Sequence, residues 1–374
     1  MSCELFAIIG PGIGPNHSVE GRDAMKARKL FLYAILSGMI LAARTGAAQA
    51  AAATGVPTVL NVVVTDKADR PVAGLQSGDF TVVDNKQERS VIGVRQVAGE
   101  TPDADPPLEA VLLVDEINSS FETMARERKD LENYLRQRSG PLPLPTSFVF
   151  LTETELKFQG APSRDAKLLL QNLENNPNPQ RSFQPQGGFQ QGVQMREKSL
   201  QALNGVALKL RDRPGRKLVI WISPGWPAFP SLTVQKSAKE MDGLFTYIVS
   251  LSTLLREAQI TLYSVDPYGA MRDLAIAGNQ SYKPFVKGVA TAKDADNGDL
   301  YLQVIATQTG GQVLYGSNDI AGMIDKCLAD AQTFYDLTYD AAAAKHANEY
   351  HGIQIKVDKP GLKARTRTGF YAQP

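Results

Sequence analysis

The sequence is poor in the residue types that most often carry covalent chemistry. It contains two cysteines, three histidines and two tryptophans among 374 residues. Removal of an amino-terminal leader that includes Cys3 would leave Cys327 alone, which excludes an intrachain disulfide framework. Cys327 lies in an apolar helical pattern, and this context favours a small core side chain over a nucleophile.

An excess of charge of one sign is also lacking. The chain has 40 basic and 39 acidic residues, for a net charge of +1. It has no long basic stretch of the kind that marks a nucleic-acid surface, so we expect no nucleic-acid partner. The length is sufficient for a full α/β domain together with a smaller one.

Residues 1–50 resemble a Sec-type signal peptide with a long leader. Basic residues at positions 26–29 precede an apolar run at 30–43, and Ala48-Gln49-Ala50 places small residues at cleavage spacing. The run is short for a membrane span, so an uncleaved anchor is the minor alternative. We expect a protein that is secreted, periplasmic or attached to the cell envelope, without a stable membrane span after cleavage. Met25 is an alternative start.

Both ends of the remaining chain have the two-residue periodicity of strands. Residues 56–98 contain strand-like segments at 59–65, 80–84 and 90–97, and residues 335–374 contain others at 335–339, 351–357 and 364–371. A handful of short strands is only marginally stable alone, whereas six or seven match an immunoglobulin-like sandwich. We therefore predict that the two ends pair in one accessory β-sandwich. The alternative is two independent β appendages.

Between these ends, residues 108–334 alternate strands with helices. Strands are predicted at 108–114, 146–151, 217–223, 260–266 and 311–315, with an edge-like segment at 155–159. Helices are predicted at 121–137, 164–173, 193–211, 234–258, 300–309 and 319–334. This alternation predicts an α/β domain with a doubly wound, mostly parallel sheet.

The segment at 108–114 is the centre of this prediction. Its continuous apolar residues are typical of a parallel strand that is buried on both faces. Ligands of doubly wound sheets bind at the carboxyl ends of such strands, which is where Asp115 lies. Two long loops, at 175–191 and 267–299, also interrupt the domain, and loops of this length are usually functional or mobile.

Several motifs of this region, in their order and spacing, resemble a von Willebrand factor A (VWA) domain. The whole chain after the leader resembles the secreted VWA-containing family that is common in acidobacteria. The residues that carry the likeness are Val111–Ser120, Pro214–Trp226, Leu262–Asp266 and Ala306–Gly311, with Phe334–Tyr339 and Arg367–Tyr371 near the end. The resemblance implies a Rossmann-like fold and a non-enzymatic module for protein–protein interaction or adhesion in the bacterial envelope.

The resemblance also implies a position for a metal-ion-dependent adhesion site. In such a site a divalent cation is held by an Asp-x-Ser-x-Ser loop, a distant Thr and a distant Asp. Asp115 matches the first residue of that loop and Ser119 the last, but Ile117 replaces the middle serine. Asn118 and Ser120 are candidate substitutes.

The more distant ligands of that site are missing. The chain has Ser223-Pro224-Gly225 where the second Asp is expected, and it lacks a Thr beside Gly187-Gly188. Loss of an anionic ligand weakens a hard-cation site substantially. We therefore expect a degenerate site with no resident cofactor, and Mg²⁺ at Asp115 remains the less favoured alternative. The favoured role of Asp115 is to cap the helix at 121–137.

Catalytic patterns are weaker still. Once the leader is removed, His346 and His351 are the remaining histidines, and both lie far from Asp115 in the sequence. Ser223 stands in Ile-Ser-Pro-Gly and lacks the Gly-x-Ser-x-Gly context of hydrolases. We predict that the chain is not an enzyme. A hydrolase or nucleotide-dependent enzyme on a doubly wound sheet is the alternative, because fold does not determine function.

The loops at the carboxyl ends of the strands are the predicted binding surface for a protein partner. Asn118, Phe189 and Trp226 are its candidate contact residues. Exposed aromatic side chains are effective anchors in protein interfaces. For Trp226, packing within its own loop is an equal alternative.

Overall fold

The computed structural model describes residues 55–98, 107–176, 188–226, 236–269 and 282–374. The predicted signal peptide and most of the predicted loop at 175–191 lie outside this part of the chain. Within the described ranges, no helix combines the length and the apolar character that a membrane crossing requires.

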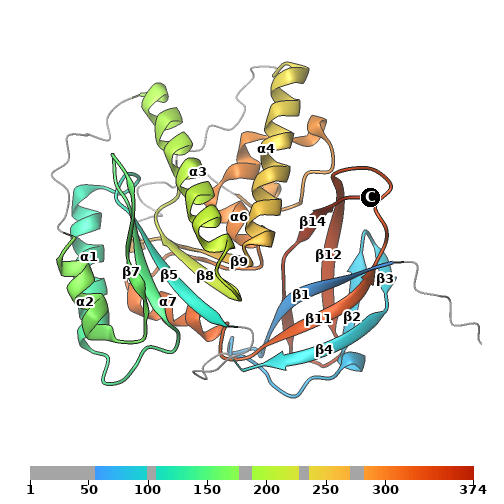
Figure 1. Ribbon diagram of the computed structural model, residues 1–374, viewed down its shortest axis with the longest axis horizontal. Helices are drawn as coiled ribbons and strands as arrows, with labels where there is room; N and C mark the ends of the chain where they lie inside the picture. The colour runs from blue at the N-terminus through green and yellow to red at the C-terminus, as the bar shows by residue number, and fades with distance from the viewer. Residues whose placement is uncertain (1–54, 99–106, 177–187, 227–235, 270–281) are drawn as a thin grey trace, which may run out of the picture. The chain divides into compact units, whose positions relative to one another are not determined.

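A six-stranded sheet forms the centre of the α/β region, in the order β10-β9-β8-β5-β6-β7 (Figure 1). Its pairs are parallel except for β7, which runs antiparallel to β6 at one edge. Its strands are β5 (Leu108–Asp115), β6 (Thr146–Leu151), β7 (Leu156–Ser163), β8 (Arg216–Ile222), β9 (Ile260–Val265) and β10 (Val313–Leu314). Counted along the chain, this is the doubly wound order 3-2-1-4-5-6, whose direction reverses between β5 and β8.

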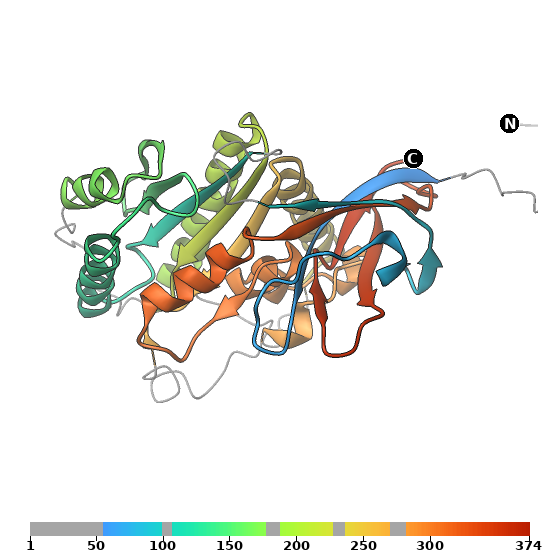
Figure 2. The same cartoon turned by 90° about the horizontal axis from the view of Figure 1, so that it is seen from below.

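Helices cover both faces of this sheet, as Figures 1 and 2 show. One apolar core lies under α1 (Phe121–Arg136), α2 (Ala166–Glu174) and α7 (Ile320–Ala329). The other lies under α3 (Phe189–Arg211), α4 (Ala238–Glu257) and α6 (Leu302–Gln308). Alternate residues of one strand enter different cores, because successive side chains of a strand point to opposite faces.

The strands from the two ends of the chain form two further sheets. One has the order β13-β1-β11-β4 and the other β14-β12-β2-β3, and both have strands from each end (Figure 2). In the first, Leu60 pairs with Leu337, and both are fully buried in the shared core. The bounds are β1 (Val56–Thr65), β2 (Phe80–Asp84), β3 (Gln87–Arg89), β4 (Val91–Val97), β11 (Phe334–Ala341), β12 (Glu349–Val357), β13 (Lys363–Arg365) and β14 (Gly369–Ala372).

The predicted fold class is therefore confirmed, including the accessory sandwich built from both ends. Some element bounds were wrong. The helix predicted at 319–334 ends at Ala329, and Phe334 begins β11. Phe334 is fully buried in the same core as α7, so its apolar position continued the helical pattern although its backbone is extended.

The strand predicted at 364–371 is divided in two. Thr366 donates its hydroxyl to the Asn61 carbonyl oxygen at 2.7 Å, and the Thr368 N–H donates to the Gln308 carbonyl oxygen at 3.1 Å. These long-range bonds hold the segment that connects β13 in one sheet to β14 in the other. No local pattern in the sequence indicates such a change of sheet. The predicted loop at 175–191 was also too long, since α3 begins at Phe189.

Candidate functional site

The candidate site lies where the strand order of the central sheet reverses. Asp115 is the last residue of β5, and Ser223 follows β8 on the neighbouring strand. Both side chains are completely buried. This is the position at which doubly wound sheets bind their ligands.

Five protein hydrogen bonds converge on the Asp115 carboxylate. Oδ1 accepts from the backbone N–H groups of Ile117 and Asn118, both at 3.1 Å. Oδ2 accepts from the Asn118 side-chain amide at 2.7 Å, the Trp221 indole N–H at 3.0 Å and the Ser223 hydroxyl at 2.8 Å. A carboxylate has about four lone-pair positions, so these donors occupy its capacity.

This donor set does not fit a divalent cation. Mg²⁺ requires oxygen atoms that present lone pairs to it, whereas the five groups that contact the Asp115 carboxylate direct hydrogens toward it. In the described ranges, no group of three or more His, Cys, Asp or Glu side chains is placed to hold a metal ion. Ser119 is buried. The hydroxyl of Ser120 is used within α1, where it accepts from the Thr123 N–H at 3.2 Å.

The predicted role of Asp115 as a helix cap was wrong. Ser120 is the N-cap of α1, and its hydroxyl also donates to the Thr123 hydroxyl at 2.9 Å. Asp115 instead organises the loop between β5 and α1. Asn118 extends this network to α3, because its side-chain amide also donates to the Ser199 hydroxyl at 2.9 Å.

Two tryptophans pack against each other next to Asp115. Trp221 is fully buried in β8, and the sequence did not indicate its bond to Asp115. Strand alternation is consistent with this bond. Trp221 pairs with Leu113, and Leu113 and Asp115 are two residues apart in β5, so Trp221 and Asp115 lie on the same face of the sheet. The Trp226 ring meets the Trp221 ring edge-on at 5.2 Å between centroids, and its indole N–H donates to the Leu300 carbonyl oxygen at 2.7 Å.

The expectation of an exposed Trp226 at the rim is therefore corrected. Its side chain is only 5% exposed, because it fills the space beside Trp221 and under Leu300. Phe189, by contrast, is 64% exposed at the start of α3. Asn118 is partly buried, and its amide is committed to Asp115 and Ser199.

Glu127 on α1 adds a second buried carboxyl group near the site. Neither of its oxygens has a hydrogen-bond partner in the described part of the chain. Burial, followed by the negative charges of Asp115 and Glu116, raises the pKa of Glu127 well above its usual value. Glu127 therefore holds its proton to a higher pH than an exposed glutamate does, while the Asp115 carboxylate is stabilised by the five groups that donate to it.

Exposed aromatic side chains mark the same edge of the sheet. Phe121 begins α1 and is 57% exposed, and Tyr315 follows β10 and is 53% exposed. With Phe189, these residues lie where strands end or where crossover helices begin, which is the carboxyl edge of a parallel sheet. We call these three residues the aromatic rim. Sequence patterns did not single out Phe121 or Tyr315, because exposure depends on how neighbouring loops pack.

The described residues do not form a nucleophile–base pair at this site. The Ser223 hydroxyl donates to Asp115, and His351 lies in the sandwich on β12. His351 is buried, with Nδ1 2.9 Å from Oδ2 of Asp84. Asp266, another strand-end acid, accepts from the Tyr268 N–H at 2.9 Å within its own turn.

No protein-family model matches this sequence, and no curated protein matches it. Among solved structures, the proximal thread matrix protein 1 of the mussel byssus is 11% identical, with a TM-score of 0.36 over 66% of this chain and 51% of that one. This chain thus spans about half the length of that protein. A second structure of the same protein, with a zinc-occupied MIDAS motif, is 10% identical, with a TM-score of 0.36 over 66% and 50% of the two chains. The SpRpn10 VWA domain is 10% identical, with a TM-score of 0.26 over 58% of this chain and 94% of that one.

Proposed function

We propose that this chain is an exported VWA-type module that binds a protein partner without a divalent cation. The observation that carries the proposal is the saturated carboxylate of Asp115. An adhesion site needs this carboxylate to bind the metal, but here Trp221, Ser223 and Asn118 donate to it. A partner is therefore bound by the surface of the rim instead of by a shared cation.

The aromatic rim supplies that surface. Phe121, Phe189 and Tyr315 each expose more than half of their side chain. Aromatic residues are enriched among the anchors of protein interfaces, since they bury a large apolar area when a partner docks. The partner that fits this edge is a folded protein with complementary apolar pockets.

The finer parts of the proposal rest on the sequence motifs. We place the chain in the secreted VWA-containing family of acidobacteria and in the periplasm, envelope or medium. The basic residues, apolar run and Ala48-Gln49-Ala50 support export. Mass measurement of the chain produced by its host would then give an amino terminus near Ala51. A mature chain that retained residues 30–43 would contradict cleavage.

Affinity capture from an envelope extract of the host tests the binding mode. The purified chain is used as bait with and without EDTA, beside a Phe121→Ala/Phe189→Ala double variant. Leu208→Ala is the matched control, because Leu208 is 50% exposed near the other end of α3. We expect a partner that EDTA does not release, that the double variant loses and that the control retains. Release by EDTA would contradict a cation-independent interface.

A further inference from the structure

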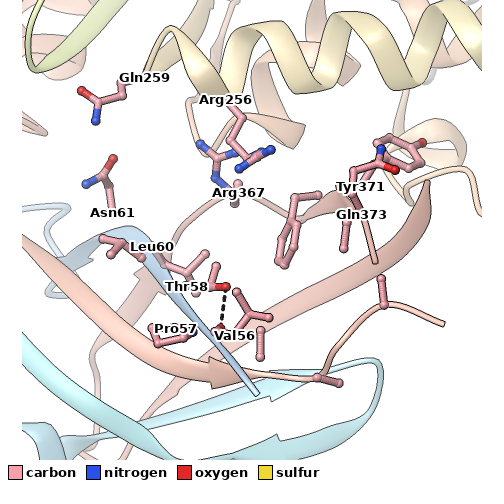
Figure 3. Close-up of a pocket in the computed structure, with 16 residues that line it drawn as sticks. Val56, Pro57, Thr58, Leu60, Asn61, Arg256, Gln259, Arg367, Tyr371 and Gln373 are labelled. Carbon is pink, nitrogen blue, oxygen red and sulfur yellow. Dashed lines mark hydrogen bonds between the residues drawn. The ribbon is translucent and has the colours of Figure 1, made fainter. Parts of the chain in front are cut away.

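A cavity lies away from the aromatic rim, between the sandwich and α4. It has a volume of about 440 Å³ and is bordered by β1, by β14 and by residues at the carboxyl end of α4 (Figure 3). Helices such as α4 run antiparallel to the strands they join, so the carboxyl end of α4 lies at the opposite edge of the sheet from the rim. The cavity is therefore separate from the surface proposed above.

Two arginines are the charged residues of its lining. Arg256 comes from α4 and Arg367 from the segment between β13 and β14, and no Asp, Glu or Lys borders the cavity among the described residues. Figure 3 shows the two guanidinium groups close together above β1. Neither forms an ion pair or a side-chain hydrogen bond with a residue that the structure describes, although Arg256 lies 6.0 Å from the Phe370 ring centroid.

Two carboxylates of this region, Asp336 and Asp330, are already paired with other groups. Asp336 accepts from Asn61 at 2.6 Å and pairs with Arg95 at 2.6 Å. Asp330 pairs with Arg365 at 2.7 Å. The positive charge in the cavity is consequently not compensated by these acids.

The titration of Arg367 agrees with this geometry. Burial, followed by the positive charges of Arg256 and Arg216, lowers the pKa of Arg367 to about 10. The side chain stays charged at neutral pH but lies in a positive potential. Guanidinium groups bind carboxylates in a bidentate, charge-assisted manner, so an anion at this position would relieve the repulsion.

One wall of the cavity is an open strand edge. On the side of β1 opposite β11, β13 pairs with residues Val63–Thr65 only. The Asn61 carbonyl oxygen faces this side, because it accepts from Thr366. Backbone groups alternate along a strand, so the N–H and C=O of Val59 face the same side and border the cavity. Such groups are available to an added strand.

The remaining walls are apolar. Val56, Phe370, Tyr371 and several alanines are among the residues that border it. The site therefore combines an anion-binding end, an open backbone edge and an apolar lining. A free carboxylate joined to a short extended chain with apolar side chains matches all three features.

We propose that this cavity binds the carboxyl-terminal residues of a protein partner as an extended peptide. The free α-carboxylate contacts Arg256 and Arg367, the peptide backbone pairs with the edge of β1 at Val59, and an apolar terminal side chain packs against Phe370. This binding is independent of the aromatic rim, so the two proposals can fail separately.

Two hexapeptide pools test the proposal on the full chain. Both have random sequences that end in Leu, Val or Phe, and they differ only in a terminal carboxylate or a terminal carboxamide. Retention of each labelled pool on immobilised protein is measured at constant ionic strength. We expect the carboxylate pool to bind at least about tenfold more tightly, the effect of a charge-assisted hydrogen bond worth about 1.5–3 kcal/mol.

Four variants assign the binding to the cavity. Arg256→Gln changes an exposed side chain and is expected to keep the fold while losing the preference for the carboxylate pool. Arg367→Gln is expected to lose it too. Arg211→Gln, on α3 beside Asp212, is the matched control and should bind like the original chain. The Phe121→Ala/Phe189→Ala variant should also retain peptide binding.

Several results would overturn the proposal. Equal retention of the two pools, or retention of neither, would exclude recognition of a peptide carboxylate. Binding that Arg256→Gln leaves unchanged would exclude this cavity. If acetate or inorganic phosphate alone bound as tightly as the peptides, the cavity would be a simple anion site. Competition by phosphatidylglycerol vesicles at the same arginines would indicate a lipid headgroup instead.

Discussion

Trp221 donates its indole N–H to the Asp115 carboxylate across two neighbouring strands, with 3.0 Å between Nε1 and Oδ2. Because Trp221 is fully buried, its N–H needs a protein acceptor, and Asp115 supplies one. Each of the two groups thus satisfies the other's requirement for a hydrogen bond in the core.

Loss of one donor to Asp115 should destabilise the fold. Ser223→Ala removes the hydroxyl that lies 2.8 Å from Oδ2. Hydrogen bonds to charged groups contribute about 1.5–3 kcal/mol, so we expect a decrease of this size in the free energy of unfolding. Ser264→Ala is the matched control, since the Ser264 hydroxyl is buried without a partner among the described residues. Urea denaturation that finds equal effects for the two variants would contradict the role of Ser223.

Glu127 should make the fold less stable as pH rises. Its folded-state pKa is raised above the usual 4.5, so between these two values the unfolded chain has released a proton that the folded chain retains. Stability then falls with increasing pH in that window. Glu127→Gln stays neutral and should be more stable than the original chain at pH 7, by about 1–3 kcal/mol, with little difference at pH 4.

Glu122→Gln is the control for this measurement, because Glu122 is exposed in the first turn of the same helix. Its effect should stay within about 0.5 kcal/mol. Thermal and urea unfolding between pH 4 and pH 8 supply the comparison. A Glu127→Gln variant whose stability follows that of the original chain at every pH would show that Glu127 ionises normally.

Asp299 should titrate near neutrality. Burial raises its pKa to about 6, although the Asp296 N–H donates to its carboxylate at 2.7 Å. Between pH 3.8 and about 6 the folded chain retains a proton on Asp299 that the unfolded chain has released. The stability that this proton contributes is therefore fully present below pH 3.8 and is lost as the pH rises through about 6. Carbon-detected NMR titration should locate this pKa directly. The loss amounts to at most about 3 kcal/mol, and Asp299→Asn should remove it while Asp294→Asn should not. A measured pKa below 4.5 would contradict the burial argument.

The shared sandwich predicts that damage to one end of the chain exposes the other. Deleting residues 335–374 removes β11 and β12, the partners of β1 and β2. Residues 56–97 should then become sensitive to protease while 108–334 stays largely folded. Leu337→Ala is a milder change, and its cavity beside Leu60 should cost about 2–5 kcal/mol. The exposed Ile92→Ala is its control. Continued protection of residues 56–97 after the deletion would contradict a shared core.

The order of elements was predictable because burial on both faces leaves a strong pattern. The apolar run that precedes Asp115 identified the central strand, and the alternation that follows it identified the doubly wound sheet. Pairing between the strands of the two ends was also predictable, since neither set has enough strands to form a stable sandwich alone. The change of sheet at Thr366 was not predictable, because it depends on hydrogen bonds to Asn61 and Gln308, which are distant in sequence.

The site was predictable in position but not in its internal contacts. The sequence placed Asp115 at the carboxyl end of the central strand and showed which ligands of an adhesion site are missing. It did not indicate which groups contact Asp115, because the bonds from Trp221 and Ser223 cross between strands. Trp226 was misplaced for the same reason. Its loop folds back on Leu300, a contact over 74 positions of the sequence.

Calorimetric titration with Mg²⁺ and Mn²⁺ tests the central claim most directly. The purified chain and an Asp115→Asn variant are titrated at neutral pH with millimolar cation, with an exposed-surface variant, Asp294→Asn, as control. Because protein donors occupy the Asp115 carboxylate, we predict no saturable binding in any of the three proteins. Saturable binding that the original chain shows, that Asp294→Asn retains and that Asp115→Asn loses would contradict this account and restore a cation-dependent adhesion site.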